Sequence, residues 1–328
     1  MPNKNRGEIR ALLEKSYREC FPYLPPVRLD ICITTACNTN CAYCWHQKKS
    51  GSKLTFESIA QVIDVLCGQR PPKLNLTGGE PTVYPDFERV LEYARISGIK
   101  DILLCTNGFR FQDPDFAEKV VELGVTALNV SVDTLDPEKF EKLRGFKLSV
   151  MRKVLANLAG LKKKYPSVSI TLASVISKMV TPDDLFEVSE FAKKNGFGYF
   201  TQTFLKTAYH SVNSAFNLSE KERDAFRQKM PWLVGKVADV VKRDVNPLTG
   251  KEKRMPCYKG ITTVKLSSDG SVGFCWTSEP VGNILRDNFS DIWVSSAAKE
   301  MRRYIRDGRC RCDFDCDIYE SIELYEDV

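Results

Sequence analysis

Histidine is scarce in this sequence, with only two residues in a chain of 328. His46 closely follows a cysteine-rich loop, where we expect a residue at the rim of a site rather than a ligand, and His210 falls in an expected linker. A histidine general base is therefore not expected. Any proton transfer would fall to Asp, Glu, Lys, Tyr or Cys side chains, the other groups that serve in acid–base catalysis.

Long apolar stretches are also lacking. No run approaches the roughly eighteen apolar residues of a membrane-spanning helix, so we expect no membrane partner. The segment from Met1 to Arg10 is polar and charged, and it lacks the apolar centre of a secretory signal. We therefore expect a cytoplasmic protein.

The charge balance is only mildly basic, with 48 Lys and Arg against 42 Asp and Glu. Such an excess can attract an anionic substrate or RNA, but the lysines are scattered along the chain. No nucleic-acid-binding motif is present. We interpret the basic residues as a solvated surface and do not expect a nucleic-acid partner.

Cysteine, in contrast, is abundant, with twelve residues. Disulfide-dense proteins are usually small and secreted, whereas clustered cysteines in a chain without a secretory signal favour metal ligation in a reducing compartment. Eight of the twelve fall into two sets: Cys37, Cys41 and Cys44, and then Cys257, Cys275, Cys310, Cys312 and Cys316.

The first set lies in the short loop Cys37–Cys44, directly after an alternating run that predicts a strand. Three and then two residues separate its thiols, and no fourth cysteine is near in sequence. Three thiolates on a four-iron cluster would leave one iron open to an exogenous ligand. The alternative is zinc, although structural zinc loops usually pair their cysteines and take four ligands.

Strand and helix patterns alternate six times along residues 27–204. This alternation predicts an α/β fold with a parallel sheet wound in one hand. A (β/α) barrel, with function at the carboxyl ends of its strands, fits the pattern. A doubly wound open sheet would give the same alternation.

Polar residues share one face of at least four of the predicted strands. In the strand 127–133, Asn129, Ser131 and Asp133 alternate with apolar neighbours, and successive side chains of a strand point to opposite faces. A purely structural barrel fills its lumen with Val, Ile and Leu. The polar inner face therefore predicts a lumen that holds a polar ligand.

The pattern changes after Cys257. The runs 261–267 and 271–276 flank an Asp-Gly turn and predict a β-hairpin, and a helix is expected at about 296–306. Cys257 precedes the first strand and Cys275 ends the second, so this fold could bring the two thiols close together.

The first cysteine loop and the segment Thr77–Thr82 resemble two motifs of the radical S-adenosylmethionine (SAM) superfamily. The loop is similar to its cysteine signature, with Tyr43 at the aromatic position, and Gly78-Gly79-Glu80 resembles its GGE motif. The resemblance covers roughly residues 27–204. It implies a partial, TIM-like (β/α)6 barrel, which decides between the two architectures.

The resemblance also implies the chemistry. Cys37, Cys41 and Cys44 would hold a [4Fe–4S] cluster whose open iron binds SAM, and an electron would cleave SAM to a 5′-deoxyadenosyl radical that removes hydrogen from a substrate. Glycines would allow close approach to SAM, Glu80 would accept from its ammonium group and Arg144 would pair with its carboxylate. A purely structural role is the alternative for Asn107, Ser131 and Arg144. The implied cofactor-binding residues are Tyr43, Gly78, Gly79, Glu80, Asn107, Ser131 and Arg144.

The C-terminal segment resembles the twitch domain, a short form of the SPASM extension, in Cys257-x₁₂-Gly270-x₄-Cys275 and the cysteines downstream. This implies one auxiliary [4Fe–4S] cluster. Cys310 could replace Cys312 or remain a thiol, and a zinc site is the alternative. We expect the four ligands to be Cys257, Cys275, Cys312 and Cys316.

An auxiliary cluster can accept the electron of a substrate radical, which favours net oxidation, crosslinking or epimerisation. The expected substrate is a small molecule or a ribosomal peptide, and the expected electron donor is a flavodoxin or ferredoxin. Cys32 and Cys105 lie on the inner face by parity and are candidate hydrogen donors, although buried cysteine often only fills space. An RNA-modifying enzyme and a non-enzymatic zinc or iron–sulfur interaction protein are the alternatives.

Four segments are expected along the chain. They are an N-terminal extension (1–26), a radical SAM core (27–208), a helical bridge (209–254) and a twitch domain with a small β-hairpin and helix (255–328).

Overall fold

The computed structural model describes residues 6–44, 53–203, 219–229, 244–245, 252–253, 257–276, 278–307 and 309. His46, His210 and the ligand candidates Cys310, Cys312 and Cys316 lie outside these residues. Of the expected bridge, the structure describes the helix α8 (Glu220–Lys229) and the antiparallel pair β7 (Asp244–Val245) and β8 (Glu252–Lys253).

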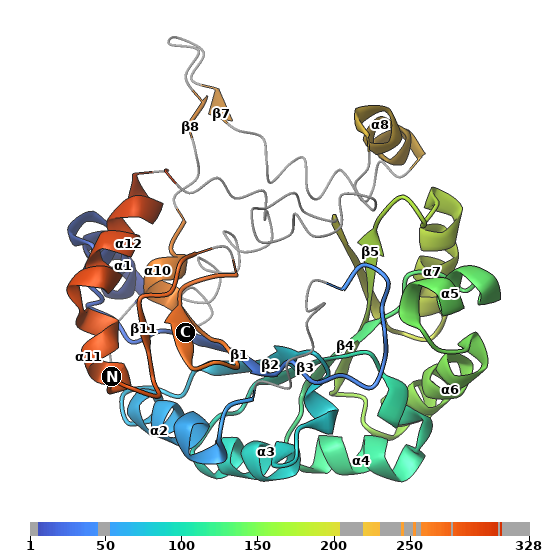
Figure 1. Cartoon of the computed structure of the whole chain (residues 1–328), viewed down its shortest axis with the longest axis horizontal. Helices are drawn as coiled ribbons and strands as arrows, with labels where there is room; N and C mark the ends of the chain where they lie inside the picture. The colour runs from blue at the N-terminus through green and yellow to red at the C-terminus, as the bar shows by residue number, and fades with distance from the viewer. Residues whose placement is uncertain are drawn as a thin grey trace.

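Six parallel strands form the wall of the barrel, in the same order in the sheet as in the sequence (Figure 1). In the described residues the strand β6 pairs on one side only, so the barrel is open there. The predicted partial (β/α)6 barrel is confirmed. Its strands are β1 (Arg28–Thr34), β2 (Lys73–Gly78), β3 (Ile102–Thr106), β4 (Ala127–Ser131), β5 (Ser169–Ile176) and β6 (Gly198–Thr203).

Helices cover the outer side of this wall (Figure 1). Three of them begin at a capping residue followed by proline: the side chains of Asp113, Asp136 and Thr181 accept from backbone N–H groups of the first turn. No helix in the described part of the chain has the length and apolar character to cross a membrane. The helices of the barrel are α2 (Phe56–Cys67), α3 (Phe87–Ile96), α4 (Pro114–Glu122), α5 (Pro137–Arg144), α6 (Leu148–Lys164) and α7 (Pro182–Lys194), with 3₁₀ turns η1 (Pro81–Val83) and η2 (Phe109–Gln112).

The two faces of β4 confirm the predicted parity. Leu128 and Val130 are fully buried under the helices, whereas Asn129 and Ser131 on the opposite face remain partly exposed. Because the helices lie outside, the partly exposed polar face belongs to the lumen.

The C-terminal hairpin continues the sheet of the barrel rather than forming a separate layer. Its first strand pairs in parallel with β1, with Lys265 opposite Asp30, and two further strands follow on the outer edge. Residues 261–262, expected as strand, instead end a short helix, because their N–H groups both donate to the carbonyl of Tyr258. The elements are α10 (Lys259–Thr262), β9 (Thr263–Leu266), β10 (Ser271–Gly273), β11 (Gly282–Asn283), α11 (Phe289–Val294) and α12 (Ser296–Arg306).

A buried arginine joins these C-terminal elements. Arg302 of α12 donates to the carbonyl oxygens of Gly260 (2.6 Å) and Trp293 (2.8 Å), and its guanidinium lies over the rings of Phe274 and Trp293. Burial lowers the pKa of Arg302 to about 10, so it is still charged at neutral pH. The helix α1 (Arg6–Glu19) packs beside α12, where the Tyr17 hydroxyl donates to the carbonyl of Arg306 at 3.2 Å.

We expect Arg302→Ala to lower the free energy of unfolding by about 2–4 kcal/mol, because it removes buried packing and leaves two carbonyl groups without a donor. Arg303 is exposed on the same helix, and Arg303→Ala should change stability by less than about 0.5 kcal/mol. Chemical denaturation of both variants measures the difference. Equal midpoints for the two would contradict the role of Arg302.

Candidate functional site

The cysteine loop lies at the carboxyl end of β1. The hydroxyl of Thr39 lies 3.3 Å from the sulfur of Cys37 and 3.8 Å from the sulfur of Cys41. The Cys44 N–H donates to the carbonyl of Cys41 at 3.1 Å, which closes a tight turn. The loop thus gathers its cysteines at one place, and all three are half-buried.

The two glycines of the GGE segment meet the backbone of residues 34–36, which lead from β1 into this loop. Gly79 N–H donates to the Thr34 carbonyl at 2.7 Å, and Glu80 N–H donates to the Ala36 carbonyl at 2.8 Å. A Cβ at Gly79 would lie 2.2 Å from the Ala36 oxygen, and one at Gly78, where φ is +144°, would lie 2.4 Å from the Thr34 oxygen. Glycine is therefore required where this segment contacts the residues that lead into the cysteine loop. The predicted approach of these glycines to SAM stays a prediction.

Glu80 is fully buried, and the protein already occupies both of its carboxylate oxygens. Oε1 accepts from the N–H and hydroxyl of Thr82 and from the Thr106 hydroxyl, and Oε2 accepts from the Asn107 N–H at 2.7 Å. Burial raises the pKa of Glu80, and these four donors oppose the rise. In the structure this carboxylate joins η1 to the end of β3. Its predicted bond to the SAM ammonium group stays a prediction.

Asn107 connects that end of β3 to the cysteine loop. Its side-chain nitrogen Nδ2 lies 2.8 Å from Asn38 Oδ1, 3.2 Å from Thr39 Oγ1 and 3.7 Å from the sulfur of Cys37. The oxygen Oδ1 accepts from the Phe109 N–H at 2.9 Å, which fixes the orientation of the amide. Asn107 therefore does face the site, as predicted, and it contacts the loop directly.

Arg144 lies in a buried network with Asp133 and Tyr43. Its Nε is 2.9 Å from Asp133 Oδ2, and the Tyr43 hydroxyl donates to the same oxygen at 2.5 Å. Burial alone would lower the pKa of Arg144, but the carboxylate of Asp133 raises it. Burial also raises the pKa of Tyr43 well above its usual value. Both groups therefore keep their protons at neutral pH.

The remaining nitrogens of Arg144 face the cysteine loop. Nη1 lies 3.9 Å from the sulfur of Cys41, and Nη2 is buried with no hydrogen-bond partner among the described residues. A buried donor without an acceptor is costly, so this nitrogen fits an anionic group bound at the site. Asp133 was not predicted as a site residue, although the strand parity had placed it on the inner face.

Polar side chains form a continuous hydrogen-bonded chain across the inner face of the first four strands. Asp30 accepts from Arg28 (2.6 Å) and from Asn75 (3.1 Å), the thiol of Cys105 donates to Asn75 Oδ1 (3.4 Å), and Asn129 donates to that thiol (3.9 Å). This chain, which we call the lumen ladder, bears out the predicted polar inner face.

The two candidate hydrogen donors lie on the inner face. Burial raises the pKa of Cys105 to about 12 and that of Cys32 to about 11, so both thiols are protonated at neutral pH. Cys32 is almost fully buried, and its sulfur lies 3.8 Å from the Thr34 carbonyl. Cys105 belongs to the lumen ladder and is the better placed of the two. Ser131 ends β4 on the same face, opposite Ala173 of β5.

Cys257 and Cys275 lie at the start and end of the C-terminal hairpin segment. Cys257 precedes α10, and Cys275 follows β10, where its N–H donates to the Ser278 hydroxyl at 3.3 Å. Both are half-buried. Since the other three candidates lie outside the described residues, the choice of auxiliary ligands stays a prediction.

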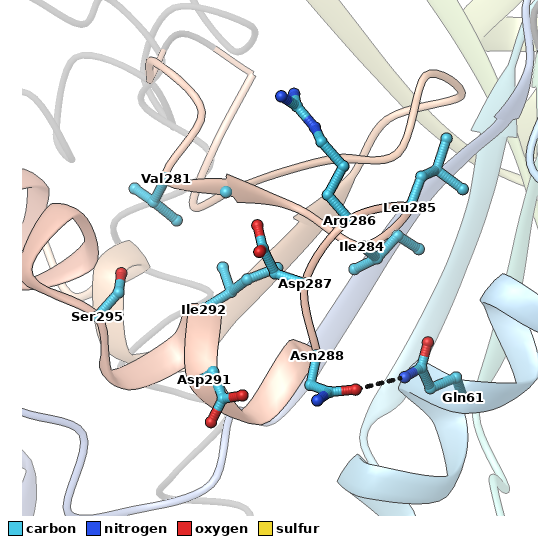
Figure 2. Close-up of a pocket in the computed structure, with 11 residues that line it drawn as sticks. Gln61, Val281, Ile284, Leu285, Arg286, Asp287, Asn288, Asp291, Ile292 and Ser295 are labelled. Atoms are coloured by element: carbon cyan, nitrogen blue, oxygen red, sulfur yellow. Dashed lines mark hydrogen bonds between the residues drawn. The ribbon is translucent and has the colours of Figure 1, made fainter.

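A pocket of ≈ 510 Å³ lies on the outer side of the barrel, where the C-terminal elements meet α2 (Figure 2). Its walls include Ile284, Asp287 and Ile292, and Gln61 of α2 donates to Asn288 Oδ1 at 3.3 Å across its edge. None of the predicted site residues lines it. The predicted residues gather instead at the cysteine loop and along the lumen.

The cysteine loop supplies three thiols, one fewer than the four ligands of a structural zinc site. A zinc ion draws four ligands onto itself, whereas a four-iron cluster binds each thiolate through a different iron. The donor without an acceptor on Arg144 also suits an anionic group beside Cys41.

Comparison with protein families agrees with this geometry. The model of the radical SAM superfamily matches residues 31–201, which is more than half of the chain. The chain belongs to the radical SAM superfamily. A second model, described as an iron–sulfur cluster-binding domain (SPASM), matches residues 257–317. The predicted cofactors of this radical SAM enzyme, a [4Fe–4S] cluster with SAM and an auxiliary iron–sulfur cluster, are thereby confirmed.

The curated relatives of this radical SAM enzyme include GTP 3′,8-cyclases. That of Tolumonas auensis is 35% identical over 144 residues, covering 42% of this chain and 41% of the relative. A probable GTP 3′,8-cyclase of Methanococcus vannielii is 29% identical over 172 residues, covering 50% and 54%. The chain thus spans only about half the length of the curated relatives it matches.

Solved structures share the fold of this radical SAM enzyme. Streptococcus suis SuiB bound to S-adenosylmethionine has a TM-score of 0.67 at 15% identity, covering 90% of this chain and 72% of that chain. Native anSMEcpe with bound AdoMet and Cp18Cys peptide has a TM-score of 0.61 at 18% identity, covering 92% and 96%. At these identities the likeness supports the fold alone.

Proposed function

We propose that this radical SAM enzyme reductively cleaves SAM at the cysteine loop and removes a hydrogen atom from a small polar molecule bound in the lumen. The lumen ladder from Arg28 to Asn129 is the observation that carries the proposal. A lumen lined with polar side chains held in fixed positions suits a polar ligand, because such groups orient a bound molecule by hydrogen bonds.

The chain's own residues would divide the work. Cys37, Cys41 and Cys44 would hold the cluster, which with SAM supplies the 5′-deoxyadenosyl radical. The Nη2 group of Arg144 would donate to the SAM carboxylate, since it is buried and has no acceptor in the described structure. If the product is an epimer rather than an oxidised molecule, the Cys105 thiol, protonated at neutral pH, would instead donate a hydrogen atom to the substrate radical, and an electron from the auxiliary cluster and a proton would restore the thiol.

The C-terminal cluster would carry electrons rather than bind SAM. Cys257 and Cys275 would supply two of its ligands, and the cluster would accept the electron of a substrate radical, giving net oxidation of the substrate. A flavodoxin or ferredoxin would reduce the SAM-binding cluster. This part of the proposal rests on the SPASM match at residues 257–317.

The experiment is anaerobic incubation of the reconstituted protein with SAM and dithionite, followed by chromatography for 5′-deoxyadenosine. We expect 5′-deoxyadenosine from the wild type and none above background from Cys41→Ala. Cys67→Ala, which changes a half-buried cysteine on α2, is the matched control and should retain the activity. A wild type that binds iron and sulfide but forms no 5′-deoxyadenosine would refute the proposal.

GTP is a second candidate substrate, because the curated relatives are named GTP 3′,8-cyclases. Cyclisation would then replace net oxidation as the outcome. If GTP is the substrate, adding it should raise the rate of 5′-deoxyadenosine formation and consume GTP in equal amount. Unchanged rates and intact GTP would exclude this candidate and leave another polar molecule as the substrate.

A further inference from the structure

Two of the three thiols in the cysteine loop lie next to nitrogen donors from outside the loop. Asn107 Nδ2, at the end of β3, is 3.7 Å from Cys37 sulfur, and Arg144 Nη1, at the end of α5, is 3.9 Å from Cys41 sulfur. Other contacts fix the orientation of both side chains. Asn107 Oδ1 accepts from the Phe109 N–H, and Arg144 Nε pairs with Asp133 Oδ2. The two side chains therefore need not move for their nitrogens to interact with the sulfurs of Cys37 and Cys41.

Such donors change the energy of an iron–sulfur cluster. Reduction adds negative charge to the cluster, and hydrogen bonds to the ligand sulfurs or a nearby positive charge stabilise the reduced form more than the oxidised form. We propose that Asn107 and Arg144 raise the reduction potential of the cluster held by Cys37, Cys41 and Cys44, and that Asp133 limits the contribution of Arg144.

The role of Asp133 follows from its position. Asp133 is fully buried and Arg144 nearly so, and charges that water does not screen interact strongly. While the pair is intact, the carboxylate offsets much of the positive potential that Arg144 places at Cys41. Neutralising one member of the pair should therefore move the cluster potential in the opposite direction from neutralising the other.

The test is the midpoint potential of the reconstituted cluster in the full-length protein, from a redox titration followed by electron paramagnetic resonance without substrate. Each variant also carries Cys257→Ala and Cys275→Ala, which remove two expected ligands of the auxiliary cluster. The signal then comes from the SAM-binding cluster alone. We expect a lower potential in Arg144→Gln, a higher one in Asp133→Asn, and a lower one in Asn107→Ala. Asn129→Ala, an asparagine of the lumen ladder that bonds to Cys105, is the matched control and should leave the potential unchanged.

A purely structural role would give a different result. If the substitutions only loosened the site, the midpoint potentials of Arg144→Gln and Asp133→Asn would shift in the same direction, or neither would shift. Either result would overturn the proposal. If Arg144→Gln does not retain a cluster, the double variant Arg144→Gln/Asp133→Asn restores a neutral pair. Its potential must then lie below that of Asp133→Asn alone, and equal potentials would overturn the proposal as well.

Discussion

Gly79→Ala is expected to abolish cluster loading and to destabilise the protein by more than about 3 kcal/mol, well beyond an ordinary substitution. The added Cβ would lie 2.2 Å from the Ala36 carbonyl oxygen and 2.6 Å from that of Thr35. Both obstacles are backbone atoms of the segment that leads into the cysteine loop. They cannot rotate away as a side chain would, so the loop itself has to move.

The measurements are iron content after anaerobic reconstitution and chemical denaturation of the cluster-free protein. Gly160→Ala is the matched control, because Gly160 lies within α6 and no heavy atom would come within 4 Å of its new Cβ. That substitution should leave iron content unchanged and stabilise the helix by up to about 1 kcal/mol. Normal iron content in Gly79→Ala would show that cluster loading does not depend on the close contact between Gly79 and the segment that leads into the cysteine loop.

The order of strands and helices was predictable because its signals are local, whereas the resemblance to the radical SAM superfamily decided between a barrel and an open sheet. An Asp-Pro or Thr-Pro pair marks the start of each of α4, α5 and α7, and the strands show an alternation that can be read without tertiary information. The polar inner face followed from the same alternation, and the lumen ladder confirms it. The attachment of the hairpin to β1 was not predictable, because it pairs Asp30 with Lys265, and no local pattern specifies so distant a partner.

The candidate site was predictable as a set of residues, but their contacts were not. The resemblance identified Glu80, Asn107 and Arg144, yet the sequence could not reveal that both oxygens of Glu80 accept from protein donors or that Arg144 pairs with Asp133. Likewise, Gly145 follows Arg144 in sequence. Only the structure shows that a Cβ added at Gly145 would lie 2.8 Å from the Asn40 carbonyl oxygen in the cysteine loop. Each of these facts depends on segments that meet only after folding.

Glu80→Gln is expected to lower the free energy of unfolding by about 2–4 kcal/mol, because a buried amide replaces a carboxylate that accepts four hydrogen bonds. Oε1 has three of the four donors and is the oxygen that the glutamine will retain. The new NH₂ group then faces the Asn107 N–H, and two donors oppose each other in a site without water access. Glu57→Gln, an exposed change on α2, is the control and should cost less than about 0.5 kcal/mol.

The same variant also tests whether Glu80 has a structural role or binds the SAM ammonium group. Both oxygens already serve the protein, and the side chain has no exposed surface. We therefore expect the cluster-loaded fraction of Glu80→Gln to bind SAM within about threefold of the wild type, less than about 0.7 kcal/mol. An ammonium-binding carboxylate would give the reverse pattern, a large loss of SAM affinity with little loss of stability. Equilibrium binding of SAM and denaturant unfolding, measured on one preparation, decide between the two, because the structural role moves the unfolding midpoint and the ligand role moves the Kd.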